Sequence, residues 1–69
     1  MDTRALVRCR RLAETGALRA MRESLGLSLT EAGTAAGVSR VTIWRWEHRQ
    51  RRPHGEAAVR YLRALEELP

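Results

Sequence analysis

The sequence predicts an all-α fold, a compact bundle of about five short helices. Residues of high helix propensity dominate the chain, and β-branched residues never alternate over the length of a strand. Glycines and prolines recur at intervals that leave room for short helices only. The 69 residues are too few for a doubly wound nucleotide fold or a two-domain enzyme, so we expect a single domain over residues 1–69.

Two helices are predicted before residue 26. The first begins after Thr3, and apolar residues line one of its faces at steps of three and four, namely Leu6, Cys9, Leu12 and Ala13. Its other face is basic, with Arg4, Arg8, Arg10 and Arg11. Gly16 interrupts this pattern, and a second helix is predicted over residues 16–25, before Gly26.

Three more helices follow from capping residues and chain breakers. Ser28 and Glu31 have the spacing of a capping box, so a helix of about two turns should begin at Leu29 and end near Gly37. Ser39 is a good cap for the next helix, over residues 40–48. After Pro53 a last helix is predicted over residues 55–67, with an apolar face formed by Ala58, Tyr61, Leu62, Leu65 and Leu68.

The positive charge is concentrated in one segment. All thirteen basic residues are arginines, against eight acidic ones, which gives a net charge of +5. Residues 40–52 alone hold five arginines and one acidic residue. Such a segment is either an ordinary solvated face or a surface for a polyanionic partner.

The two tryptophans of the helix over residues 40–48 must face different ways. Each residue advances about 100° around a helix, so Trp44 and Trp46 lie about 200° apart. We expect Trp46 to share the core side with Ile43. The opposite side then carries Arg40, Val41, Trp44, Arg45 and His48. Trp44 either meets a ligand there or packs under a terminal helix.

Apolar residues at positions 32, 36, 38, 43 and 46, with Gly33 and Gly37 between them, fit the spacing of a helix-turn-helix. The segments LSLTE (27–31) and AAGVSRVTI (35–43), followed by Trp46, Glu47 and Pro53, resemble the lambda-repressor-like, XRE-type DNA-binding domain. The resemblance covers residues 16–67 and leaves residues 1–15 as an additional N-terminal helix. The exclusive use of arginine and the stretch over residues 51–58 resemble actinobacterial or actinophage members.

The resemblance implies roles for individual residues. The recognition helix, about residues 40–48, would lie in the major groove and read bases with Arg40, Val41, Trp44 and Arg45. The residues expected to hold DNA phosphates are Ser28, Thr30, Ser39, Thr42, His48, Arg49, Arg51 and Arg52. Arg22 and Glu47 match a structural ion pair that clamps the first helix of the family's domain to the recognition helix.

Four positions depart from the family pattern. Leu29 stands where relatives often place a phosphate-binding glutamine, so that contact is absent or moved. Ala32 replaces a common leucine and Gly33 a common alanine, which predicts close packing of the paired helices with less apolar burial. Gly33 also costs about 1 kcal/mol of helix propensity relative to alanine. Arg49 replaces a common helix-ending glycine, so the recognition helix should run on or end differently.

The sequence therefore predicts a sequence-specific transcriptional regulator of double-stranded DNA, a small phage or bacterial repressor that binds as a homodimer. The first or last helix would form the dimer contact or simply complete the core. The alternative is a protein-interaction module of the same fold, an antitoxin-like or adaptor subunit. A lone Cys9, expected to be a core residue rather than a reactive thiol, fits a reducing cytoplasm, where the protein would associate with the nucleoid.

Other chemistry is not expected. The single aspartate, Asp2, lies at the terminus, and the glutamates pair with no evident base or nucleophile, so no catalytic residues are predicted. Cys9, His48 and His54 lack the spacing of a zinc site. No cofactor, metal or small-molecule substrate is predicted, and no uncharged stretch is long enough to cross a membrane.

Overall fold

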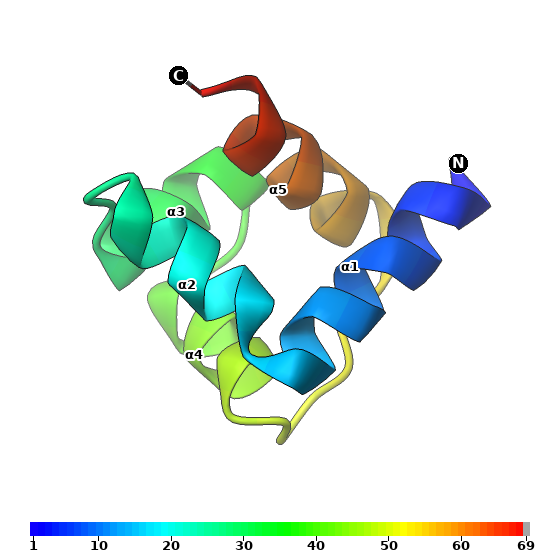
Figure 1. Cartoon of the computed structure of the whole chain (residues 1–69), viewed down its shortest axis with the longest axis horizontal. Helices are drawn as coiled ribbons and strands as arrows, with labels where there is room; N and C mark the ends of the chain where they lie inside the picture. The colour runs from blue at the N-terminus through cyan, green and yellow to red at the C-terminus, as the bar shows by residue number, and fades with distance from the viewer. Residues whose placement is uncertain (69) are drawn as a thin grey trace.

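A computed structural model describes residues 1–68 and shows five α-helices in a compact bundle (Figure 1). The helices are α1 (Thr3–Thr15), α2 (Ala17–Ser24), α3 (Leu29–Ala36), α4 (Arg40–Glu47) and α5 (Gly55–Glu67). No strand occurs among these residues. The predicted all-α bundle is confirmed, and each helix begins within one residue of its expected start. None of the helices is long and apolar enough to cross a membrane in the portion that the structure describes.

Serine caps fix where the two helices of the helix-turn-helix begin. The Ser28 hydroxyl accepts the Glu31 backbone N–H at 3.0 Å, and the Glu31 carboxylate accepts the Ser28 N–H at 2.9 Å, which completes the predicted capping box of α3. That hydrogen bond from the Ser28 backbone lowers the pKa of Glu31. The Ser39 hydroxyl caps α4 by accepting the Thr42 N–H. Both helices therefore begin at positions set by local sequence.

One buried cluster joins all five helices. Its largest fully buried side chains are Trp46, Tyr61, Leu18, Ile43 and Leu62. From α1 the cluster takes Ala5, Leu6, Cys9 and Ala13, because α1 packs on α2 and α5. Burial raises the pKa of the Cys9 thiol to about 11, so the thiol stays protonated in the core. Leu68 is a correction to the expected apolar face, since it lies beyond the end of α5 and is largely exposed.

Gly33 lets α3 approach the following turn more closely than alanine would. A Cβ atom at Gly33 would lie 2.6 Å from the Val38 carbonyl oxygen and 3.1 Å from the Arg40 nitrogen. Glycine is therefore required at this position for steric reasons, although it lowers the helix propensity of α3. Close packing of the paired helices, as expected from the sequence, depends on the missing side chain.

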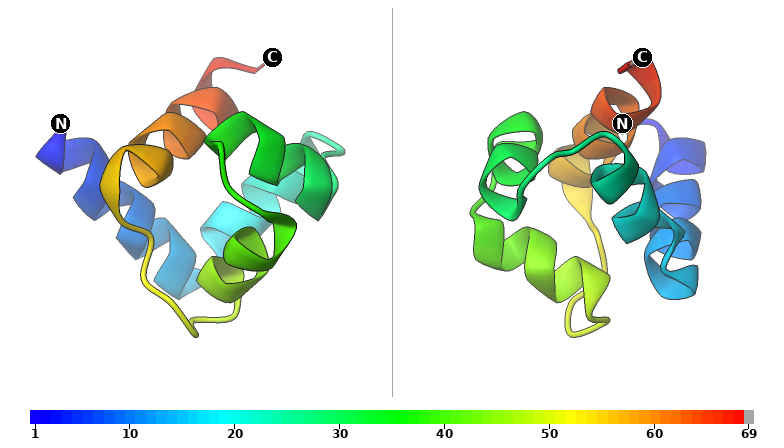
Figure 2. Two further views of the ribbon diagram at one scale, coloured as in Figure 1. Left: turned by 180° about the vertical axis from the view of Figure 1, so that it is seen from behind. Right: turned by 60° about the vertical axis from the view of Figure 1, so that its left-hand side comes forward.

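The helix α3 lies on the opposite side of the molecule from α1, and α4 packs on α3 while also contacting α1 (Figures 1 and 2). A loop over residues 48–54 leads from α4 to α5 and passes the C-terminal end of α1 (Figure 2). The outer side of α4 is thus left uncovered by the other helices.

Candidate nucleic-acid interface

The two sides of α4 differ sharply in exposure. Ile43 and Trp46 are 0% and 1% exposed, so Trp46 is the core tryptophan, as predicted. The outer side bears the four residues expected to read bases, all of them exposed, namely Arg40, Val41, Trp44 and Arg45. Trp44 does not pack under a terminal helix, since its side chain is 38% exposed on this outer side.

A buried ion pair holds the inner side of α4 against α2. Arg22 Nε donates to Glu47 Oε2 at 2.6 Å, and Arg22 Nη2 donates to Glu47 Oε1 at 3.0 Å. Arg22 Nη1 also donates to the Leu27 carbonyl oxygen at 2.8 Å. The hydrogen bonds to Glu47 raise the pKa of the Arg22 guanidinium. Because this pair is two-pronged and almost fully buried, it fixes the position of α4 on α2.

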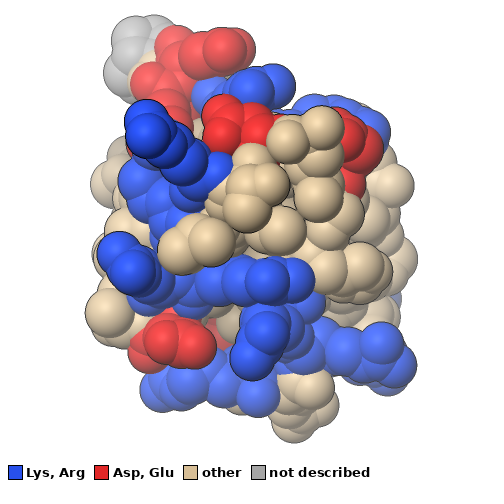
Figure 3. All heavy atoms as spheres, turned by 90° about the vertical axis from the view of Figure 1, so that its right-hand side faces the viewer, with Lys and Arg blue, Asp and Glu red and all other residues tan. Residues whose placement is uncertain are grey.

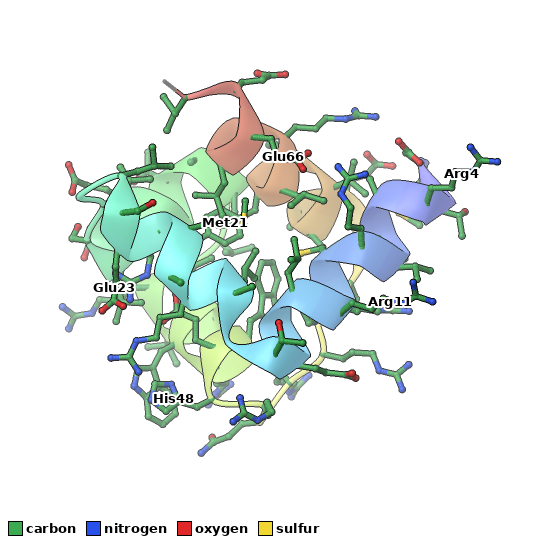
Figure 4. All side chains as sticks on the ribbon, viewed as in Figure 1. Arg4, Arg11, Met21, Glu23, His48 and Glu66 are labelled. Atoms are coloured by element: carbon green, nitrogen blue, oxygen red, sulfur yellow. The ribbon has the colours of Figure 1, made fainter. Side chains whose placement is uncertain are left out.

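Trp44 and His48 form a stacked pair on the outer side. Their ring centroids are 4.0 Å apart and their planes differ by 16°. His48 Nδ1 also lies 2.9 Å from the Trp44 carbonyl oxygen, in hydrogen-bond contact. Figure 4 shows the labelled His48 beyond the end of α4, far from Arg4 and Arg11 on α1. The stack therefore holds the Trp44 indole in a defined position beside Arg45.

The arginines of residues 40–52 have no acidic partner among residues 1–68. Four arginines elsewhere have one, in the pairs Arg8–Glu66, Arg19–Glu23, Arg22–Glu47 and Arg63–Asp2, and the other four outside this segment, Arg4, Arg10, Arg11 and Arg60, form no ion pair among residues 1–68. Arg40, Arg45, Arg49, Arg51 and Arg52 form no ion pair in this part of the chain, and all five are exposed. Their charges are available to an external anion.

The expected phosphate-binding residues lie in three places, namely the start of α3, the start of α4 and the loop after α4. Ser28 and Thr30, at the start of α3, line one hollow together with Arg40, Val41 and Trp44. Ser39 and Thr42, at the start of α4, have hydroxyl oxygens 3.3 Å apart. Residues Thr42, Arg45, Arg51 and His54 line a second hollow, which joins α4 to the loop.

The loop after α4 begins with an unusual backbone conformation at Arg49. Its φ of 58° is the left-handed conformation that glycine favours, so α4 ends at Glu47 as it would before a glycine. The expectation that the helix would run on or end differently is wrong, because arginine adopts the glycine-type conformation at this position.

Arg10 belongs to this loop region although the sequence placed it only on the basic face of the first helix. Its Nε donates to the Pro53 carbonyl oxygen at 2.7 Å, and the residue lines a hollow with Arg49, Arg51 and Arg52. Figure 3 shows arginines gathered over the lower half of the face that carries α1. No local signal could have found this contact, because it joins residues 43 positions apart.

Sequence comparison agrees with the geometry. The model of a family described as Helix-turn-helix matches residues 18–68, which covers α3, α4 and α5 in full and almost all of α2. No curated protein and no solved structure matches the chain. In the part of the chain that the structure describes, histidines, cysteines and acidic residues form no group of three that could hold a metal ion.

Proposed function

The chain belongs to the XRE-type, lambda-repressor-like helix-turn-helix family, and from that premise we propose that it is a sequence-specific repressor that reads the major groove of double-stranded DNA through α4. As a member of this family, the chain is a DNA-binding helix-turn-helix regulator. The family consists of DNA-binding domains and is not a family of enzymes. Repression is the proposed mode because it requires only that the protein occupy its site. The site of action would be the nucleoid, in the cytoplasm.

The observation that carries this proposal is the outer side of α4, where Arg40 and Arg45 are exposed and have no carboxylate partner in residues 1–68. An arginine fork can donate two hydrogen bonds to guanine O6 and N7, which is worth roughly 1–3 kcal/mol of discrimination. We therefore expect a guanine opposite Arg40 or Arg45 in each half-site.

Phosphate contacts would come from both ends of this surface. The proposed residues are Ser28, Thr30, Ser39, Thr42, His48, Arg49, Arg51 and Arg52, which flank Arg40 and Arg45. One domain covers only a few base pairs, so we propose that two copies bind half-sites about one helical turn apart. With about three phosphates neutralised per copy, the logarithm of the affinity should fall with the logarithm of salt at a slope of roughly −5.

Residues 1–69 are proposed to act as one domain. The helix α1 lies outside the matched family segment, yet four of its residues belong to the buried cluster shared with α5. Its role in this proposal is to complete the core. A measurement of the solution mass, free and with DNA, tests whether two copies associate.

The test begins with selection of binding sites from a randomised duplex library, followed by gel shifts with three variants. At one position of the site, Arg40→Ala should prefer the selected base pair over the others about 5- to 150-fold less than the wild type does. The reason is that the two hydrogen bonds from the guanidinium to that base are lost. Arg52→Ala should weaken binding equally for all sequences and reduce the salt slope by about one per phosphate lost. The control is Arg4→Ala, which removes an exposed arginine of α1 and the same charge.

The alternative, a protein-interaction module, is favoured only by the exposed apolar side chains Val41 and Trp44. Such a module does not need the unpaired arginines around them. Normal DNA binding by both Arg40→Ala and Arg52→Ala would reject the proposed reading surface, and a library without any enriched sequence would reject the regulator of specific sites.

A further inference from the structure

The start of α3 and the outer side of α4 border an open, mostly apolar hollow of about 540 Å³. Its lining residues are Ser28, Leu29, Thr30, Arg40, Val41 and Trp44. Val41 is 47% exposed and Trp44 is 38% exposed, so both apolar side chains meet water in the free protein. Exposed apolar surface of this kind on a small charged domain indicates contact with a ligand.

The chemistry of the rim identifies the kind of occupant. Arg40 stands at the edge with no carboxylate partner in residues 1–68, and the hydroxyls of Ser28 and Thr30 stand at the start of α3. A purely apolar partner would offer no acceptor to the Arg40 guanidinium or to the hydroxyl protons of Ser28 and Thr30. The occupant must therefore present an apolar group beside hydrogen-bond acceptors and negative charge.

The major-groove edge of a thymine in DNA has this combination. Its 5-methyl group is the apolar feature of the base edges, and it lies beside the O4 acceptor. Neighbouring guanines supply acceptors for an arginine, and the backbone supplies phosphates for hydroxyl groups. Because the hollow opens beside Arg40, a methyl group could enter it while that guanidinium contacts an adjacent base.

We propose that Leu29, Val41 and Trp44 form a receptor for a thymine 5-methyl group, so that the protein reads thymine next to the base read by Arg40. This inference rests on the proposed function and adds a specificity element to it. It also gives Leu29 a role, since its side chain supplies the α3 wall of the hollow. The Trp44–His48 stack then serves to hold the indole wall in position.

The test removes the methyl group alone. Each thymine of the duplex selected from the randomised library is replaced in turn by deoxyuridine, which keeps the base pairing and both hydrogen-bonding edges. At one thymine per half-site the affinity should fall about fourfold, the loss expected for one buried methyl group. The other replacements should leave the affinity unchanged.

Two matched variants assign the effect to this hollow. Val41→Ser removes apolar surface from the wall, so the penalty at the sensitive thymine should fall below about twofold. Val7→Ser makes the same change at a valine of α1 that is 39% exposed, and it should keep the full penalty. Both valines are exposed, so neither variant should unfold the domain.

The outcomes separate this inference from the proposed function. A selected duplex in which every deoxyuridine replacement is neutral would overturn the methyl receptor and leave sequence-specific binding intact. An equal penalty in wild type and Val41→Ser would also overturn it. If the library enriches no sequence at all, the proposed function fails and this inference fails with it.

Discussion

The inner and outer sides of α4 treat charge in opposite ways. On the inner side, the Glu47 carboxylate accepts two hydrogen bonds from Arg22 and is almost fully buried. On the outer side, Arg40 and Arg45 are exposed and have no acidic partner in residues 1–68. One face of this two-turn helix therefore fixes its position, while the other leaves its charges free for a ligand.

This contrast has a consequence for mutagenesis. Changes on the inner side should lower stability and DNA affinity together, because a displaced α4 cannot present its outer side. Changes on the outer side should alter affinity alone, since exposed side chains away from special features change the free energy of unfolding by about 0.5 kcal/mol or less.

The largest effect is expected for Glu47→Ala. Without the carboxylate, the Arg22 guanidinium remains buried and unpaired, which should cost about 3–5 kcal/mol of unfolding free energy. For a domain of this size, that is most of its stability. Urea denaturation followed by tryptophan fluorescence measures the loss, and gel shifts should show that affinity falls with it.

The control for Glu47→Ala is Glu66→Ala, which breaks the exposed pair with Arg8. An exposed ion pair is worth at most about 1 kcal/mol, because water already screens both charges. Equal stability of the two variants would contradict the clamp between α2 and α4 and would remove the contrast between the faces.

A smaller loss is expected for Gly33→Ala, which tests how closely α3 must lie to the start of α4. Alanine would gain about 1 kcal/mol of helix propensity, but its Cβ would overlap the Val38 carbonyl oxygen, 2.6 Å away. Overpacking against backbone should outweigh the gain and leave a net cost of about 1–2 kcal/mol. Thr34→Ala, exposed in the same helix, should be neutral or slightly stabilising, and a stabilised Gly33→Ala would contradict the steric requirement.

Much of the fold could be predicted because its determinants are local in sequence. The capping box of Ser28 and Glu31 spans four residues, and the positions of Trp44 and Trp46 follow from helix geometry alone. Capping residues and helix periodicity were therefore enough to predict where the helices begin and which residues of α4 face the core. The resemblance to a known family supplied the pairing of Arg22 with Glu47, which lie 25 residues apart.

The candidate site was less predictable because its shape depends on the spacing of separate helices. The hollow that contains Leu29 lies between the start of α3 and the outer side of α4, so its shape depends on how two separate helices are placed. Arg10 meets the loop across 43 residues of chain, and its neighbours in sequence do not indicate that contact. Patterns along one helix could not reveal either feature.

The smallest effect is expected at Arg49, where the requirements of fold and binding oppose each other. Its φ of 58° costs a residue with a Cβ about 1 kcal/mol relative to glycine. Arg49→Gly should therefore raise the free energy of unfolding by up to about 1 kcal/mol. The same change removes a proposed phosphate contact, so the affinity for all DNA sequences should fall and the salt slope should become shallower.

Arg51→Gly is the matched control, because it removes the same charge from the same loop at a residue without a positive φ. It should weaken DNA binding in the same way but leave stability unchanged or slightly lower, since glycine there gains no conformational relief. If Arg49→Gly is no more stable than Arg51→Gly, the backbone at Arg49 is not strained. If Arg49→Gly is more stable than Arg51→Gly and binds DNA as the wild type does, Arg49 contributes to the fold alone. The DNA-binding surface then ends before residue 49.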